Sequence, residues 1–129
     1  MLRRILAGSN PMHKLQFFLF MKQYVLTLDL KDDPELIAAY EAHHKKVWPE
    51  VLQSIRDSGI EHMQIYRFQT RLCMIVSARD DFSFDAKAAM DAANEKVQEW
   101  ETLMWRYQQA LPGAPEGAKW MLMDLIFEC

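Results

Sequence analysis

Apolar residues in this chain switch between two spacings, and the order of the switches limits the folds it can adopt. Four runs have the alternating or continuously apolar pattern of strands. They are residues 23–31, 60–68, 72–78 and 119–128. A helical spacing separates the first run from the second, and another separates the third from the fourth. This order predicts a ferredoxin-like α+β fold (βαββαβ), in which one antiparallel sheet carries both helices on one face.

Proline and glycine mark the limits of the first helix. Asp33 offers an acidic N-cap, and Pro34 suits the first helical position. Pro49 disfavours helical geometry at Trp48, so we expect the helix to kink or restart there. We expect the second piece to stop at Gly59, because glycine commonly follows the last helical residue.

The second helix and the last strand are predicted from longer patterns. Apolar residues recur at steps of three and four, which indicates one long amphipathic helix over residues 84–110. The run 119–128 is apolar on both faces except for Asp124, so we expect a strand that is covered on both sides. The sheet face without helices would still expose apolar groups, and we therefore expect a back-to-back homodimer, a dimeric α+β barrel.

The length of the chain predicts a single domain over residues 23–129, preceded by an N-terminal extension of residues 1–22. The apolar run 15–21 in that extension is far shorter than the ~20 residues of a membrane span. Residues 8–11 interrupt what would be the apolar region of a signal peptide. The sequence therefore favours a cytoplasmic protein that does not act at a membrane.

Charge and cysteine content narrow the possible partners. A net charge of −3 without a basic stripe argues against nucleic acid. Cys73 and Cys129 lie far apart and form no CxxC pair, so we expect free thiols in a reducing compartment. His13 and His62 form no metal-binding pattern with the other histidines, and no glycine-rich phosphate loop is found. We expect neither a metal nor a cofactor.

Tyr40 and His44 are about one helical turn apart, so their side chains lie on the same face. Imidazole titrates near neutral pH and serves as a general acid or base, and a phenol beside it can orient a hydroxyl substrate. The same stripe is also typical of a helix core that contains one satisfied histidine. His43 points about 100° away from His44 and is expected to be solvated.

The tryptophans also have a structural and a functional interpretation. Trp100 lies on the apolar stripe of the second helix, where packing is the usual role of tryptophan. Its ring could instead be a platform on which the C–H face of a sugar stacks. Trp48 is expected to be structural, because Pro49 restricts its backbone.

A motif on the first helix gives a more specific indication. The chain contains Y-x3-H-x3-WPE, formed by Tyr40, His44, Trp48, Pro49 and Glu50. This motif resembles the signature of the L-rhamnose mutarotase family, and the resemblance runs from about residue 21 to residue 127. It implies a ferredoxin-like dimer that interconverts the α and β anomers of L-rhamnose without a cofactor. It also implies that His44 is the catalytic acid and that Tyr40 contacts the sugar.

Two positions depart from the family pattern. Met63 stands where the rhamnose enzymes have a sugar-contacting tyrosine, and Trp100-Glu101 stands where they have a Trp-Trp pair. A carboxylate accepts hydrogen bonds from sugar hydroxyls, so the polar pattern of the pocket is changed. The predicted substrate-binding residues are Tyr40, Met63, Trp100 and Glu101, and Glu101 is also the candidate second proton carrier.

The predicted substrate is a 6-deoxy-L-hexose monosaccharide. L-rhamnose and L-fucose, which differ at C2 and C4, are close to equal candidates, and L-rhamnose comes first only because it represents the family. A dimeric-barrel monooxygenase, including the heme-degrading kind, shares this topology, although the WPE match argues against it. A second alternative is a non-catalytic sugar-binding dimer, in which His44 would only donate a hydrogen bond. We favour a cofactor-independent mutarotase over both alternatives.

Overall fold

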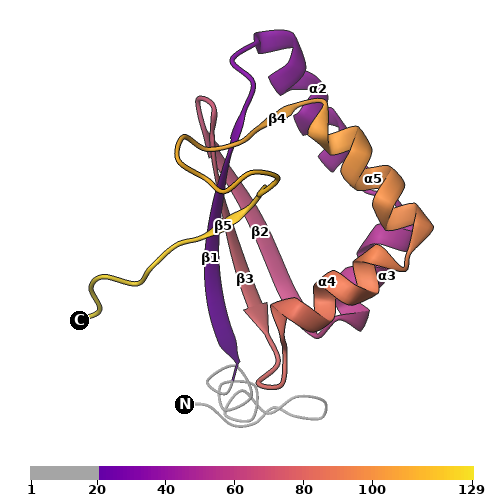
Figure 1. Cartoon of the computed structure of the whole chain (residues 1–129), viewed down its shortest axis with the longest axis vertical. Helices are drawn as coiled ribbons and strands as arrows, with labels where there is room; N and C mark the ends of the chain where they lie inside the picture. The colour runs from indigo at the N-terminus through magenta and orange to yellow at the C-terminus, as the bar shows by residue number, and fades with distance from the viewer. Residues whose placement is uncertain (1–20) are drawn as a thin grey trace, which may run out of the picture.

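The computed structural model describes residues 21–129, and these form an antiparallel sheet with helices on one face (Figure 1). The strands are β1 (Lys22–Leu30), β2 (Ile60–Phe68), β3 (Arg71–Ala78), β4 (Gln108–Gln109) and β5 (Met121–Leu122). The helices are α2 (Pro34–His44), α3 (Pro49–Asp57), α4 (Phe84–Ala92) and α5 (Glu95–Trp105). The ferredoxin-like α+β class is confirmed. The predicted N-terminal extension, apart from its last two residues, lies outside the described residues.

The sheet has the order β2-β3-β1, and β4 and β5 both pair with β1. All of these pairs are antiparallel. Side chains alternate between the two faces, because successive strand residues point in opposite directions. Leu28, Leu72 and Val76 face the helices and are at most 1% exposed. One face of the sheet therefore packs against the helices and bounds the space between the two layers.

Two clusters of buried residues join the helices to this sheet face. One contains Trp100 and Met104 of α5, Tyr40 of α2 and Val51 of α3. The other lies around Phe82 at the far end of the sheet. Through the first cluster, one face of α5 packs against both α2 and α3.

The break between α2 and α3 follows the prediction. Asp33 Oδ1 accepts hydrogen bonds from the amides of Glu35 at 2.9 Å and Leu36 at 3.2 Å, which caps α2. Trp48 has an extended conformation with φ −59° and ψ 137°, and Pro49 begins α3. The proline therefore separates the helices, and Gly59, with φ 103°, follows the end of α3 as expected.

The prediction of one continuous helix over residues 84–110 is wrong. The chain forms α4 and α5 with a break at residues 93–94. Asn94 Oδ1 accepts hydrogen bonds from the amides of Lys96 at 3.1 Å and Val97 at 3.2 Å. An asparagine side chain competes with the helical backbone in this way, and here it starts a new helix. The second helix also ends at Trp105, well before residue 110.

The prediction of a long final strand is also wrong. Only Met121 and Leu122 pair in the sheet, and the residues after them project from the side that carries no helices (Figure 1). Leu125, Ile126 and Phe127 are 77%, 93% and 77% exposed. They pair with no strand among residues 21–129, and no other described element covers either face of the segment.

None of the helices within residues 21–129 has the length and apolar character that a membrane crossing requires.

Candidate active site

A cavity of about 1190 Å³ lies between the helical layer and the sheet face beneath it. Its wall includes all the predicted site residues, namely Tyr40, His44, Met63, Trp100 and Glu101. They come from α2, β2 and α5, which are far apart in the sequence. The fold therefore brings the predicted site residues to one concave surface, which is the usual form of a small-molecule site.

Tyr40 and His44 stand one above the other on α2, with ring centroids 4.4 Å apart. The Nδ1 atom of His44 lies 2.9 Å from the carbonyl oxygen of Tyr40. A carbonyl oxygen can only accept, so Nδ1 carries the proton and donates this hydrogen bond. The neutral imidazole then has its lone pair on Nε2. His44 is thus prepared to take a proton from a group in the cavity.

The environment of His44 favours the neutral imidazole. Burial lowers the pKa of His44 below its usual value of 6.5, and the positive charge of neighbouring His43 acts in the same direction. The hydrogen bond to the backbone of Tyr40 opposes this shift in the pKa. Because the pKa is lowered overall, His44 is mostly unprotonated at neutral pH.

Tyr40 is 3% exposed but still contributes to the cavity wall. Burial raises the pKa of its phenol above the usual value of 10.0, and the hydrogen bond from Gln108 opposes the rise. Gln108 Nε2 donates to the phenol oxygen of Tyr40 at 3.5 Å. The phenol therefore stays protonated and can orient a hydroxyl group.

Trp100 packs in the core and also contributes to the cavity wall. It is 8% exposed in the core, where its ring lies 5.2 Å from that of Trp48 in an edge-to-face arrangement. This contact agrees with the structural role expected of Trp48. The ring of Trp100 also lies 5.6 Å from that of His44, and part of it lines the cavity. An aromatic surface is therefore available beside the imidazole.

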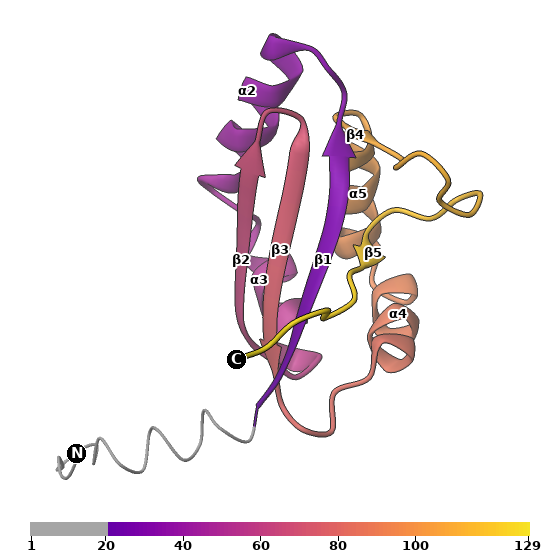
Figure 2. The same ribbon diagram turned by 90° about the vertical axis from the view of Figure 1, so that its left-hand side faces the viewer.

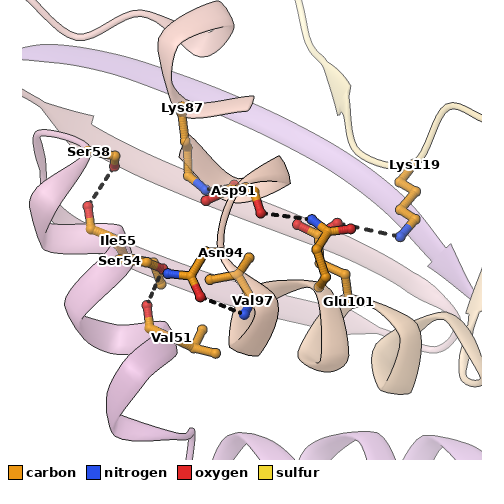
Figure 3. A network of polar contacts seen from close by, with 11 residues as sticks. Val51, Ser54, Ile55, Ser58, Lys87, Asp91, Asn94, Val97, Glu101 and Lys119 are labelled. Atoms are coloured by element: carbon orange, nitrogen blue, oxygen red, sulfur yellow. Dashed lines mark hydrogen bonds and ion pairs between the residues drawn. The ribbon is translucent and has the colours of Figure 1, made fainter. Parts of the chain in front are cut away.

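Met63 and Glu101 line the cavity from opposite sides of the fold. Met63 on β2 contributes an apolar surface. Glu101 on α5 forms an ion pair with Lys119, with 3.7 Å between Oε1 and Nζ (Figure 3). Lys119 also lies over the ring of Trp105, 5.2 Å from its centroid. Lys119 thus connects the carboxylate of Glu101 to the chain segment before β5.

The prediction that His43 is solvated is wrong. Its side chain is half-buried, and Nε2 lies 3.1 Å from the hydroxyl of Tyr107. Its ring is 6.4 Å from that of Trp100. Tyr107 follows the end of α5, so this contact depends on how α5 packs against α2. The spacing of residues on α2 carries no signal for it.

Sequence reasoning also missed most of the charged residues of the cavity wall, among them Lys87, Asp91 and Lys119. Lys87 and Asp91 are four residues apart, a spacing that favours an ion pair on a helix. That signal is present in the sequence, but the predicted continuous helix placed both residues away from the apolar stripe. Cys73 and Cys129, which do not line this cavity, are free thiols as predicted.

Across residues 21–129, no group of three His, Cys, Asp or Glu side chains has an arrangement that could hold a metal ion.

Comparisons with known proteins agree with this arrangement. The family model described as L-rhamnose mutarotase matches residues 23–129. A protein of Xanthomonas campestris pv. campestris named L-fucose mutarotase is 45% identical over 109 residues, covering 83% of this chain and 87% of that protein. The L-rhamnose mutarotase of Klebsiella pneumoniae is 24% identical over 87 residues, covering 67% of this chain and 78% of that protein.

A solved structure supports the fold. The crystal structure of an L-rhamnose mutarotase from Formosa agariphila superposes with a TM-score of 0.62 at 20% identity, covering 84% of this chain and 98% of that one. The architecture is thus that of the ferredoxin-like α+β proteins. The chain belongs to the L-rhamnose mutarotase family. It is an isomerase that interconverts the anomers of a sugar, and the monooxygenase and non-catalytic alternatives are not favoured.

Proposed function

We propose that the substrate is a 6-deoxy-L-hexose, that L-fucose is preferred to L-rhamnose, and that His44 is the catalytic residue. The relative named L-fucose mutarotase shares 45% of its aligned residues with this chain, and that named L-rhamnose mutarotase shares 24%. Met63 and the pair Trp100-Glu101 give the cavity a polar pattern that differs from the rhamnose signature. A site that binds sugar hydroxyls discriminates strongly between hydroxyl arrangements, because a wrong one leaves buried polar groups unpaired.

The observation that carries the mechanism is the orientation of His44. Its Nδ1 proton is committed to the carbonyl of Tyr40, so Nε2 acts as the base in the neutral state. Nε2 takes the proton of the anomeric hydroxyl, O1–H. The C1–O1 bond then becomes a carbonyl, the C1–O5 bond breaks, and the electron pair of that bond stays on O5. A solvent water supplies the proton that O5 takes up and is left as hydroxide.

Ring closure reverses these steps and gives the other anomer. Rotation about C1–C2 presents the opposite face of the carbonyl to O5–H. As O5 attacks C1, O5 gives its proton back to the hydroxide and the protonated His44 returns its proton to O1. The imidazole is thus a base in opening and an acid in closing. The acid role implied by the family resemblance is therefore one half of the cycle. Tyr40 and Glu101 bind sugar hydroxyls, Trp100 stacks on the ring, and Met63 provides apolar contact.

Anomer exchange measured by NMR on equilibrated sugars tests the substrate proposal. Saturation of one H1 signal is followed into the other with and without protein, for L-fucose and for L-rhamnose. We expect faster exchange for both sugars and a higher kcat/KM for L-fucose. A higher value for L-rhamnose would contradict the preference and leave the mechanism unchanged.

The lowered pKa of His44 predicts the pH dependence of the reaction. The reaction needs neutral imidazole, and the pKa lies below 6.5, so activity should persist as the pH falls through 6.5. Activity should then decline at lower pH, as the free enzyme becomes protonated. The acid limb of log kcat/KM against pH reports this value. A midpoint above 6.5 would show that the base is not a buried imidazole of this kind.

We infer that the protein is a homodimer formed by the uncovered sheet faces. Figure 2 shows this face, which the chain after β5 crosses. Tyr66 and Phe68 on β2 are 55% and 76% exposed, and β2 lies at the edge of the sheet. The segment 124–128, which pairs with no strand within residues 21–129, carries exposed apolar side chains. An exposed strand edge and an extended apolar segment can satisfy each other across two copies of the chain.

Light scattering tests the dimer. Ile75 on β3 lies opposite Val25 and Gln64, on the sheet face that carries no helices. A charge there should be intolerable in a face-to-face dimer, because it would be buried without a partner. We expect Ile75→Asp to reduce the mass from twice 15.2 kDa to 15.2 kDa. Met90→Asp is the matched control, since Met90 is 43% exposed on α4 and lies off the sheet. A wild-type monomer would contradict the inference.

A cytoplasmic location and the absence of nucleic acid from the partners belong to the same proposal. The free thiols of Cys73 and Cys129 suit a reducing compartment. The net charge of −3 gives phosphate groups little attraction.

A further inference from the structure

Helix α4 turns its charged side to the cavity and its apolar side to solvent. Asp91 is 9% exposed and Lys87 is half-buried, and both line the cavity. Ala86, Ala89 and Met90, which the sequence places on the apolar stripe, are exposed. An amphipathic helix normally buries its apolar side. In α4 the charged side chains line the cavity instead, which indicates that this wall can bind the polar groups of a ligand.

The break between α4 and α5 makes this arrangement possible. On a continuous helix, Asp91 would lie about 180° around the axis from Trp100, because the two are nine residues apart at about 100° per residue. It would then point away from the surface that Trp100 helps to form. In the structure both residues line the same cavity. The break therefore adds a carboxylate to the wall that contains Trp100.

The carboxylate is also held in place. The backbone oxygen of Asp91 accepts hydrogen bonds from the amide of Asn94 at 3.1 Å and from Gln98 Nε2 at 2.9 Å. Lys87 Nζ lies 2.6 Å from Asp91 Oδ2. Figure 3 shows Asp91 and Lys119 on either side of Glu101, so charged groups follow one another along this wall. A ligand would meet a preorganised row of donors and acceptors.

Stability alone does not explain a buried ion pair at this position. Both charges lose water on burial, and an apolar pair of similar size is often at least as stabilising. An ammonium group has three donors and a carboxylate about four acceptor positions. The bond between Lys87 and Asp91 uses one donor of the ammonium group and one acceptor position of the carboxylate. Sugar hydroxyls both donate and accept, so they suit the positions that remain.

We propose that Asp91 and Lys87 bind ring hydroxyls of the sugar and help to determine which sugar is accepted. This inference rests on the proposed function, because it takes a sugar to be the occupant of the cavity. Asp91 and Lys87 would act with Glu101 and Lys119, and His44 alone would act at O1. Their contacts are made in the ground state and in the transition state alike.

The variant Asp91→Asn tests the proposal, because it keeps the shape of the side chain and removes its charge. We expect KM for L-fucose to rise about tenfold, the usual scale for a hydrogen bond to a charged group, and kcat to change by less than about twofold. Lys87→Met should have the same effect. Glu99→Gln is the matched control, because it breaks the exposed Lys96–Glu99 pair of α5 and should change neither constant.

Deoxy analogues of L-fucose separate a binding role from a structural one. A structural ion pair would lower the melting temperature of Asp91→Asn and leave the response to each missing hydroxyl unchanged. A binding pair predicts that one deoxy analogue has a raised KM with the wild type, and that this penalty falls to about twofold in Asp91→Asn. A folded Asp91→Asn protein with the KM and analogue response of the wild type would overturn the proposal.

Binding measured by saturation-transfer NMR distinguishes a failure of this inference from a failure of the proposed function on which it rests. If the wild type binds L-fucose without accelerating anomer exchange, the proposed function fails, and weaker binding by Asp91→Asn still supports the inference. If exchange is normal and the variants bind as the wild type does, the inference fails and the function stands. If the wild type neither binds nor converts the sugar, both fail.

Discussion

Replacing His44 with glutamine is expected to lower kcat/KM for anomer exchange by about 10²–10⁴-fold, the usual contribution of a general acid–base group. Glutamine approximates the size of the imidazole and can still form hydrogen bonds, but it cannot take up the proton of O1. Because the barrier to ring opening contains that transfer, most of the loss should appear in kcat. NMR exchange rates at several sugar concentrations measure both constants.

His43→Gln is the matched control for His44→Gln. His43 is adjacent on α2, and its charge contributes to the lowered pKa of His44. Removing that charge should move the acid limb of the pH profile to higher pH while the reaction persists. Circular dichroism would show that both variants are folded. If His44→Gln keeps more than a tenth of the wild-type kcat, His44 is not the base.

Replacing Trp100 with alanine is expected to destabilise the protein by about 3–5 kcal/mol, as for large aromatic side chains in other cores. Trp100 is 8% exposed and packs against Trp48 and His44 within the first core cluster. Its removal would leave a cavity beside the imidazole and remove the aromatic surface on which the sugar stacks. We therefore expect KM to rise as well, in whatever fraction of the variant remains folded.

Urea unfolding measures the first effect, and Trp105→Ala is its control. Trp105 lies on the same helix, but it is 37% exposed and its recorded ring contact is with Lys119. Its loss should cost about 1 kcal/mol or less. Trp100→Phe should restore part of the stability and of the sugar affinity. Equal losses in the two alanine variants would show that Trp100 does not anchor the site.

The parts of the fold that could be predicted from the sequence are those with strong local causes. Pro49 removes the helical option from the residue before it, so the break between α2 and α3 follows from one side chain. The alternation in β1 and the spacing of Tyr40 and His44 are equally local. The spacing of Tyr40 and His44, together with the WPE motif, was sufficient to predict that both side chains belong to one site, and both line the same cavity.

The parts that could not be predicted depend on contacts between distant elements. The apolar spacing continues through residues 93–94, and only the capping geometry of Asn94 shows that the helix restarts. The run after Leu122 has the composition of a strand, but pairing needs a free strand edge, which the described residues do not supply there. The contact of His43 with Tyr107 joins α2 to the end of α5, across 64 residues.

A structure of the protein with L-fucose bound would test the active-site assignment most directly. We expect the sugar in the cavity between helices and sheet, with O1 about 2.6–3.2 Å from Nε2 of His44, the reach that proton transfer requires. Its apolar face should lie on Trp100. A sugar bound elsewhere on the protein, or one whose C1 lies at the far end of the cavity from His44, would contradict the assignment.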